Sequence, residues 1–371
     1  MTSLLLSAAL IVRNEERCLE TCLRSLANRV DEIVVVDTGS TDRSREIAGD
    51  LGACVLRRPW IGDFAAARNA SVDASRGRWI LYIDADEEVV EFDRAPLEAL
   101  LADPGFAAHT VLFRPGQAYT RYREYRLFRN RPDLRFRGVI HESLLPDLRQ
   151  LAARHGLRIG ASAIALDHHG YDGELAHKHA RNLPLLQARL ASEPEHVYSR
   201  DHLGTTLLGL GDETGAEAAW RHAIDVVRRL ANPDAHDSLP WLHLAAFLID
   251  RQRDAADLLL EGCAKFPDNH ALTWLQARVW LEAGRYADAQ ALFTRISRIA
   301  PDSLNDGTLA FDASIFGAPV HAALGLCAFR LGRDAESAAH YARAEALAPH
   351  DLGIRTKRML AEARARAAEM P

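Results

Sequence analysis

The sequence has few cysteines, and their arrangement does not suit a structural metal or a disulfide framework. Its 371 residues include five cysteines, an odd number, and no CxxC pair, which argues against a disulfide scaffold and a zinc ribbon. Cys18 and Cys22 are four residues apart on one face of an expected helix, so we expect them to pack in a core. We therefore expect reduced thiols and predict a cytoplasmic location.

Long apolar runs and an excess of positive charge are also missing. The segment LLLSAALIV near the N-terminus runs straight into Arg13-Asn14-Glu15-Glu16 without a preceding basic region, which predicts a buried strand and not a signal peptide. No later apolar run approaches the length needed to cross a bilayer. The formal net charge is -6, which provides no overall electrostatic attraction for nucleic acid. We expect neither a transmembrane segment nor a nucleic-acid partner.

Two parts of the chain have different sequence patterns, and the length favours two domains. Residues 4–170 alternate short apolar runs with amphipathic stretches, which is typical of an α/β domain with a largely parallel sheet. From about Leu183 onward, alanine-rich helical patterns take over. We expect domains over 1–172 and 173–371. The expected strands are 4–12, 32–36, 54–56 and 79–83, and the expected helices are 16–27, 41–51 and 64–74.

The second part of the sequence repeats itself. Pro233, Pro267 and Pro301 are each 34 residues apart, which is the period of tetratricopeptide repeats. The pattern LEAGRYADAQALF returns as FRLGRDAESAAHY after one further unit and an insertion within 303–316. This periodicity predicts an all-α solenoid of helix pairs, and an irregular helical bundle is the alternative.

The segment WILYIDADEE, from Trp79 to Glu88, ends an apolar run in a cluster of carboxylates. Acidic side chains that repel one another at a strand end indicate a bound cation, and divalent metals accept carboxylate oxygens while keeping positions open for phosphate. A solvated turn is the alternative. We expect Asp84 and Asp86 to be functional, and Glu87 and Glu88 to be solvated or to begin a helix.

The second expected strand runs into the motif DTGSTD, residues 37–42. An aspartate at this position can accept a hydrogen bond from a base or a ribose, and Gly39 permits a tight turn. Asp-Thr-Gly-Ser also occurs in aspartic proteases, but these need two such aspartates, and this chain has one copy. A helix cap without a ligand is the structural alternative for Asp37.

Four motifs in order resemble those of family 2 glycosyltransferases of the GT-A fold. They are Arg13-Asn14-Glu15 after the first strand, VVVDTGSTD, WIGDF with Arg68-Asn69, and LYIDADEE. More narrowly, the chain is similar to a bacterial subgroup in which this domain precedes tetratricopeptide repeats. The resemblance implies a Rossmann-like α/β GT-A domain followed by an all-α tetratricopeptide-repeat solenoid, and transfer of a sugar from a UDP-sugar.

The resemblance also implies roles for matching residues. The end of the first strand borders the nucleotide, and Asp37 contacts the uracil. Asp63 and Arg68, which suit a salt bridge, lie near the uridine and the diphosphate, and Asp84 meets ribose or metal-bound water. The residues expected to bind the nucleotide sugar are Val12, Asn14, Glu15, Asp37, Asp63, Arg68, Asp84, Ala85 and Arg126.

A catalytic base and two metal ligands follow from the same resemblance. Glu142 matches the base of inverting members, because a carboxylate can take the acceptor proton; a helix-capping role is the alternative. Asp86 matches the metal-ligating aspartate. His169 matches a further ligand, since imidazole suits Mn²⁺ and similar ions, and His168 is the adjacent competitor. Lys178 and Arg181 form a cationic helix face that could contact phosphate or serve as a link to the repeats.

The sequence thus predicts an inverting glycosyltransferase that uses Mn²⁺ or Mg²⁺ and a UDP-sugar. A peptide or protein hydroxyl or thiol is the favoured acceptor, because the subgroup resembles enzymes that glycosylate small ribosomally made peptides and because repeats are interaction surfaces. A cell-envelope or lipid-linked glycan is the alternative acceptor, and a degenerate scaffold is a remote one. A nucleotidyltransferase would need a glycine-rich loop, which residues 10–17 lack. The repeats could also form a homo-oligomer.

Overall fold

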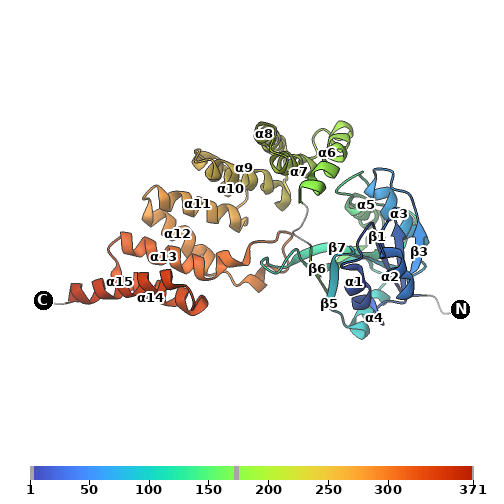
Figure 1. Ribbon diagram of the computed structural model, residues 1–371, viewed down its shortest axis with the longest axis horizontal. Coiled ribbons are helices and arrows are strands. Elements are labelled where there is room, and N and C mark those ends of the chain that lie inside the picture. The colour runs from blue at the N-terminus through green and yellow to red at the C-terminus, as the bar shows by residue number, and fades with distance from the viewer. Residues whose placement is uncertain (1–3, 171–174, 370–371) are drawn as a thin grey trace. The chain divides into compact units, whose positions relative to one another are not determined.

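A computed structural model describes residues 4–170 and 175–369. Within these ranges the chain forms two compact units (Figure 1). Unit 1 takes the described residues up to Gln117 and those from Arg121 to Ala216, and unit 2 takes Ala118–Thr120 and the described residues from Glu217 onward. The domain boundary expected at 172/173 falls outside the described residues, and the compact units divide later in the chain.

Unit 1 contains an eight-stranded sheet with the strand order β3-β2-β1-β4-β7-β6-β8-β5. Strands β1 to β4 pair in parallel, as the alternating apolar and amphipathic runs predict. Beyond β4 the sheet is mixed: β4–β7, β6–β7 and β5–β8 are antiparallel, and only β6–β8 is parallel. The strands are β1 (Leu6–Val12), β2 (Glu32–Asp37), β3 (Cys54–Arg57), β4 (Trp79–Tyr82), β5 (Glu87–Glu91), β6 (Phe106–Arg114), β7 (Tyr122–Arg129) and β8 (Arg158–His168).

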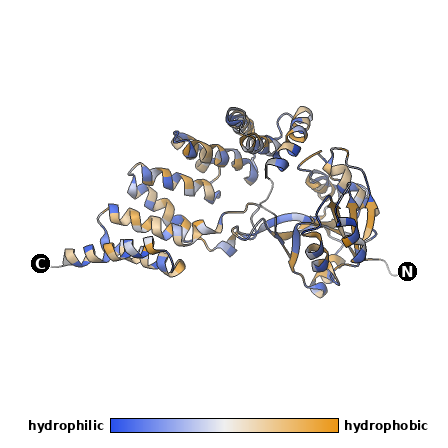
Figure 2. Ribbon diagram, in the orientation of Figure 1, coloured by the Kyte–Doolittle hydropathy of each residue, from blue (hydrophilic) through white to orange (hydrophobic). Residues whose placement is uncertain are grey.

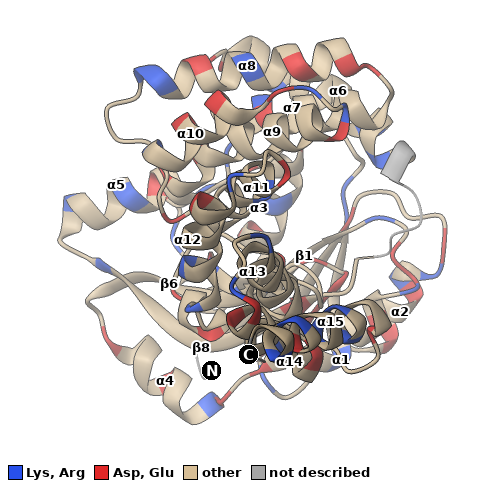
Figure 3. Cartoon of the chain, turned by 90° about the vertical axis from the view of Figure 1, so that its left-hand side faces the viewer, with Lys and Arg blue, Asp and Glu red and all other residues tan. Residues whose placement is uncertain are grey.

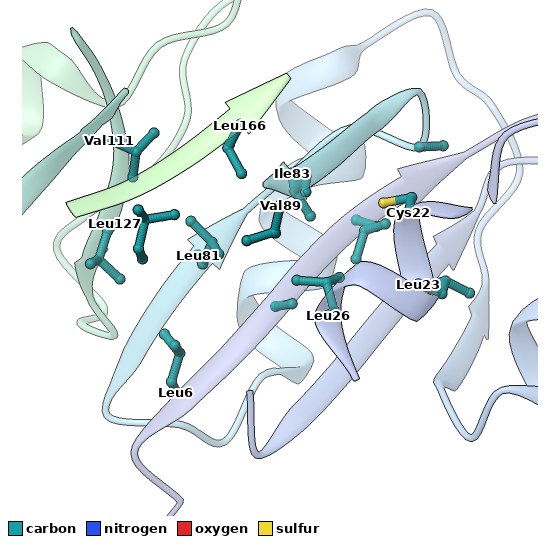
Figure 4. Packing of buried hydrophobic residues seen from close by; sticks show 14 of the residues in the cluster. Leu6, Cys22, Leu23, Leu26, Leu81, Ile83, Val89, Val111, Leu127 and Leu166 are labelled. Carbon is teal, nitrogen blue, oxygen red and sulfur yellow. The ribbon is translucent and has the colours of Figure 1, made fainter. Parts of the chain in front are cut away.

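Helices cover both faces of this sheet because its strands are apolar on both sides. Leu6, Leu10 and Val12 on β1 pack in one core, and Ala9 belongs to the core on the opposite face. Figure 4 shows Cys22, Leu23 and Leu26 from α1 beside Ile83 and Val89 in the first core. The helices are α1 (Leu19–Leu26), α2 (Ser44–Asp50), α3 (Phe64–Ala74), α4 (Arg94–Ala102), α5 (Leu145–His155), α6 (Leu175–Ser192) and α7 (Val197–Gly209).

The all-α region of unit 2 forms helices that pack on their neighbours in sequence, from α9 to α15 (Figure 1). Apolar and polar residues alternate along these helices (Figure 2). This is the nearest-neighbour packing of a helical repeat array. The helices are α8 (Glu213–Arg229), η1 (Ala235–Ser238), α9 (Leu239–Asp250), α10 (Ala256–Lys265), α11 (His270–Glu282), α12 (Tyr286–Ser297), η2 (Pro301–Leu304), η3 (Ala313–Phe316), α13 (Ala318–Arg330), α14 (Asp334–Leu347) and α15 (Leu352–Glu369).

The turns inside the helix pairs share one backbone conformation. Gly284 between α11 and α12 has a φ of 76°, and Gly332 between α13 and α14 has a φ of 74°. Gln252 occupies the equivalent turn between α9 and α10 with a φ of 55°, a left-handed value that costs a side chain energy. The repeat predicted from the prolines is therefore a repeat of helix, left-handed turn and helix.

The predicted insertion within 303–316 contains η3, and the residues just before η3 form neither a helix nor a strand. Unit 2 also takes in Ala118–Thr120, which lies far away in sequence. Thr120 N donates to Phe311 O at 2.8 Å, and Ala313 N donates to Ala118 O at 2.8 Å. The residues that break the repeat period thus form backbone hydrogen bonds inside unit 2.

None of the helices in the described ranges combines the length and the hydropathy that crossing a bilayer requires. The five cysteines are free, and Cys18 and Cys22 are buried as expected. The α/β domain followed by an all-α repeat region is the architecture that the sequence predicts.

Candidate active site

The loops after β1 and β2 are joined by hydrogen bonds between the two motifs that end these strands. Asn14 N donates to Ser40 Oγ at 3.0 Å, and Asn14 Oδ1 accepts from Thr41 N at 2.8 Å. Glu15 N donates to Ser44 Oγ at 2.8 Å. Asn14 has a φ of 58°, a conformation that asparagine tolerates better than most residues. The motifs RNE and DTGSTD therefore form one continuous surface at the strand ends.

Asp37 is buried and stabilises the turn that follows it. Its carboxylate accepts hydrogen bonds from Gly39 N at 3.3 Å and Ser40 N at 3.0 Å, and it lies 4.0 Å from Arg45 Nε. Gly39 has a φ of 117°, a conformation that favours glycine. The carboxylate of Asp37 thus already has hydrogen-bond partners within the protein, and its contact with uracil stays a prediction.

Asp63 caps helix α3 and does not pair with Arg68. Its side chain accepts from Ala66 N at 2.9 Å, as a helix N-cap does. The expected salt bridge between Asp63 and Arg68 is therefore wrong, because the cap fixes Asp63 at the helix start. Arg68 is one turn further along, and its guanidinium extends toward other carboxylates.

Arg68 links Glu142 to the acidic strand end. Its Nε donates to Glu142 Oε1, and its Nη2 donates to Asp84 Oδ1 at 2.7 Å. The side chains of Arg68 and Glu142 are 9% and 10% exposed. Burial would raise the pKa of Asp84, but Arg68 and then Arg126 lower it below its usual value. Glu142 precedes α5 but does not cap it, because the N-cap residue is Leu144.

A second buried arginine, Arg126 on β7, pairs with carboxylates from three places. Its Nη2 lies 2.9 Å from Glu87 Oε1, and its Nη1 lies 3.6 Å from Asp84 Oδ2. Its Nε donates to Glu124. Glu87 is 2% exposed, so the expectation that it is solvated or begins a helix is wrong: it begins β5. Burial raises the pKa of Glu87, and Arg126 opposes this shift.

The two histidines at the end of β8 point to different carboxylates. His168 Nε2 lies 3.0 Å from Asp86 Oδ2, and His169 Nε2 lies 2.9 Å from Glu88 Oε2. His169 reaches Asp86 only through its backbone, because its N–H donates to the carbonyl of Asp86 at 2.8 Å. The structure therefore brings His168, and not the predicted His169, to Asp86, the aspartate that the resemblance implies as a metal ligand.

Asp86 and His168 fit a divalent ion in the chemistry of their donors. A carboxylate and an imidazole suit Mn²⁺, and both side chains are partly exposed. In the described part of the chain, no three Asp, Glu, His or Cys side chains are already grouped as a metal site. An ion bound here would complete its coordination with oxygens from the substrate or from water.

The remaining predicted residues lie around these pairs. Val12 and Ala85 are buried in the core cluster beneath the strand ends. Burial raises the pKa of Glu15, and the charge of nearby Asp86 adds to this effect while Lys178 lowers it. The guanidinium of Arg181 lies 5.5 Å from the ring of Phe64. The cationic residues of α6 therefore come close to Glu15 and the start of α3.

The loop that carries Glu142 is held by helices that follow the motifs. Gly138 has a φ of 103°, and a Cβ there would lie 1.2 Å from Arg189 Nη1. Arg189 on α6 donates to the carbonyl of Arg137 at 3.3 Å. Tyr198 on α7 lies against His141, with ring centroids 4.9 Å apart. The sequence does not single out Arg189 or Tyr198, because their partners lie 52 residues or more away.

The fold and the site define an α/β protein whose strand ends converge on paired carboxylates and arginines, followed by a helical repeat region. Residues 7–147 match the family model described as glycosyl transferase family 2. This match assigns residues 7–147 to a domain of that family.

Curated relatives include a repeat protein and two glycosyltransferases. A TPR repeat-containing protein of Synechococcus elongatus is 36% identical over 257 residues, covering 67% of this chain and 62% of the relative. An uncharacterized glycosyltransferase of Rickettsia bellii is 37% identical over 97 residues, covering 26% and 33%. Glycosyltransferase SunS of Bacillus subtilis is 26% identical over 203 residues, covering 52% and 46%. The chain spans less than two thirds of the length of these relatives.

Proposed function

We propose that the protein is an inverting glycosyltransferase that needs a divalent metal and moves a sugar from a UDP-sugar to a hydroxyl or thiol of a peptide or protein in the cytoplasm. The observation that carries this proposal is the ion-pair chain from Glu142 through Arg68 to Asp84. It joins a carboxylate suited to act as a base with the acidic strand end of a family 2 domain.

The proposed reaction is a single in-line displacement. Glu142 takes the proton from the acceptor hydroxyl or thiol, whose oxygen or sulfur forms a bond to the anomeric carbon of the donor. The bond between this carbon and the β-phosphate oxygen breaks, and the electron pair leaves with UDP. The configuration at the anomeric carbon is inverted.

Asp86 and His168 would hold the divalent ion. In this proposal His168 takes the place of His169, the ligand that the resemblance implies. When bound, the ion would neutralise charge on the diphosphate leaving group. Lys178 and Arg181 lie near Glu15. Their positive charge would attract an anionic diphosphate. The loops after β1 and β2 would form the wall against which the nucleoside binds.

The proposal of a peptide or protein acceptor rests on the helical repeats of unit 2. Such arrays present extended surfaces that bind other chains, and this array takes up most of the second half of the described sequence. A glycan acceptor is the alternative, and the chemical nature of the product distinguishes the two.

The test begins with the donor. The protein is incubated with a panel of UDP-sugars and Mn²⁺, and UDP release is measured alongside UDP binding by calorimetry. We expect UDP release from at least one donor, and its loss with EDTA and in the variant Asp86→Ala. Asp73→Ala is the matched control, since Asp73 is an exposed aspartate that pairs with Arg135. An absence of both UDP release and UDP binding with every donor would refute the proposal.

The acceptor is tested with the most active donor carrying a labelled sugar. Label transferred to a peptide or protein supports the proposed acceptor, and mass spectrometry would locate the modified serine, threonine or cysteine. Label found only in an organic-soluble or glycan fraction would replace it with an envelope acceptor. Nuclear magnetic resonance of the product establishes the anomeric configuration, and retention would overturn the single displacement.

A further inference from the structure

Arg68 connects two carboxylates that belong to opposite sides of the proposed reaction. Glu142 lies on the loop before α5, and Asp84 lies at the end of β4 next to the proposed metal-binding aspartate. The guanidinium uses Nε for Glu142 and Nη2 for Asp84. An arginine side chain can serve two acceptors in this way because its donors diverge in a rigid plane, which a lysine ammonium lacks.

Packing holds this guanidinium in place. It lies over the ring of Tyr82 at 4.8 Å and near that of Phe136 at 5.8 Å. Its helix α3 begins at the Asp63 cap and packs through the buried Ala65 and Ala67. Because Arg68 is nearly fully buried, its contact with Glu142 is set by the fold and does not depend on a surface side chain finding its partner.

The ion pair between Arg68 and Glu142 matters because it neutralises a buried charge. Burying a carboxylate to the extent of Glu142 costs free energy unless a positive group lies beside it. Asp84 retains a second arginine, Arg126, whereas Arg68 is the cation that the structure places against Glu142. Loss of Arg68 would therefore affect the proposed base more than the acidic strand end.

We propose that Arg68 is a positioning residue for Glu142. It holds the carboxylate in one orientation, with Asp84 as a second anchor, and it does not bind the diphosphate of the donor. This inference rests on the proposed function, and it differs from the nucleotide-sugar-binding role that the sequence resemblance implies for Arg68.

The experiment separates these two roles through donor kinetics. UDP release from the most active UDP-sugar is measured for the natural protein and for Arg68→Met and Arg68→Lys, with UDP affinity measured by calorimetry. For Arg68→Met we expect kcat to fall about 100-fold, as a misplaced catalytic group can cause. The donor KM and the UDP affinity should stay within about threefold. The kcat of Arg68→Lys should lie between those of the natural protein and Arg68→Met, because lysine keeps the positive charge but lacks the diverging donors of the guanidinium.

Arg135→Met is the matched control, because Arg135 pairs with the exposed carboxylate of Asp73, and its kcat should not change. A parallel loss of UDP affinity and kcat in Arg68→Met would make Arg68 a donor ligand and overturn the inference. An unchanged kcat in Arg68→Met would also overturn it. If Arg68→Met does not fold, Arg68→Lys decides by the same two readings. If the natural protein neither released nor bound UDP with any donor, the proposed function itself would be refuted instead.

Discussion

The two units differ in what they bury. In the described residues, unit 1 buries charged side chains and unit 2 buries only neutral polar ones. In unit 2, ion pairs such as Arg228 with Glu261 lie on the surface, and acidic and basic residues are interspersed on α8 (Figure 3). The buried charged residues of unit 1 are Asp37, Arg68, Glu87, Arg126, Asp147, Asp167, Arg189 and Asp201.

The difference in buried charge indicates that the proposed chemistry lies in unit 1 and that unit 2 is a scaffold. A buried charge costs free energy unless it is paired, and replacing such pairs with apolar residues is often neutral or stabilising. Each buried charge of unit 1 therefore needs a partner, and at the candidate site Arg68 and Arg126 are the partners of Glu142 and Glu87. Unit 2 gains its stability from apolar packing such as that of Phe293, Ile296 and Val320, which a repeat array provides without buried charge.

The strongest test of this separation is Glu142→Gln. The amide keeps the shape of the side chain but cannot take a proton, so UDP release from the most active donor should fall about 1000-fold. UDP affinity should remain. Glu98→Gln is the control, since Glu98 is an exposed partner of Arg94. Full activity of Glu142→Gln would assign the base to another carboxylate.

The next test concerns a buried titratable group of unit 1 outside the site. His109 is fully buried between Phe106 and Trp79, and neither ring nitrogen has a hydrogen-bond partner. Burial, aided by Arg129, lowers its pKa to about 4, whereas the unfolded chain should have a value of about 6.5. The unfolded state thus binds a proton first as the pH falls, and folding stability declines between pH 6.5 and 4.

The variant His109→Leu should remove this decline, which amounts to about 3 kcal/mol below pH 4. Urea unfolding of both proteins at pH 7, 6, 5 and 4 measures it as a difference in slope against pH. His350→Leu, at an exposed position in unit 2, should leave the slope unchanged. Identical slopes for His109→Leu and the natural protein would contradict the expectation.

A third test compares neighbouring histidines. His168→Ala should weaken Mn²⁺-dependent UDP release about 100-fold at limiting Mn²⁺, since groups at a metal site commonly change its affinity by this much. His169→Ala should change it less than threefold, because its imidazole faces Glu88. A titration with Mn²⁺ measures both variants. The opposite order would restore the histidine that the sequence resemblance favours.

The smallest effects belong to the turns of unit 2. Gly284→Ala should lower the free energy of unfolding by about 1–2 kcal/mol, because a side chain is disfavoured at a φ of 76°. Gln252→Gly should raise it by about 0.5–1 kcal/mol for the same reason, less the entropy that glycine adds to the unfolded chain. Thermal unfolding measures both, and the rate of UDP release should not change. A change in kcat would show that the units are not separate in function.

The sequence predicted the elements that have local signals. The apolar run of β4, the amphipathic face of α1 and the 34-residue spacing of Pro233, Pro267 and Pro301 follow from periodicity within short segments. The mixed half of the sheet was not predicted, because the pairing of β5 to β8 is set by contacts between distant residues and not by their local pattern.

For the candidate site, too, the sequence did not predict contacts between residues that are far apart in the chain. The family motifs placed Glu142 and Asp84 near one another, but the bridge between them needed Arg68, which is 74 and 16 residues away from these partners. The choice between His168 and His169 depends on where β8 ends against β5, since His168 pairs with Glu87 at the last position of the strand and His169 follows it. Glu87 seemed solvated because its partner Arg126 lies on another strand.

The contact of Arg189 with the loop at Gly138 affects how long a catalytic fragment must be. The family motif region ends at residue 147, yet the arginine that occupies the space beside Gly138 belongs to α6, and Tyr198 beside His141 belongs to α7. A fragment cut at the end of the family match would leave the loop of Glu142 without its lateral support. The smallest piece worth expressing by itself therefore extends to Ala216, where the first compact unit ends.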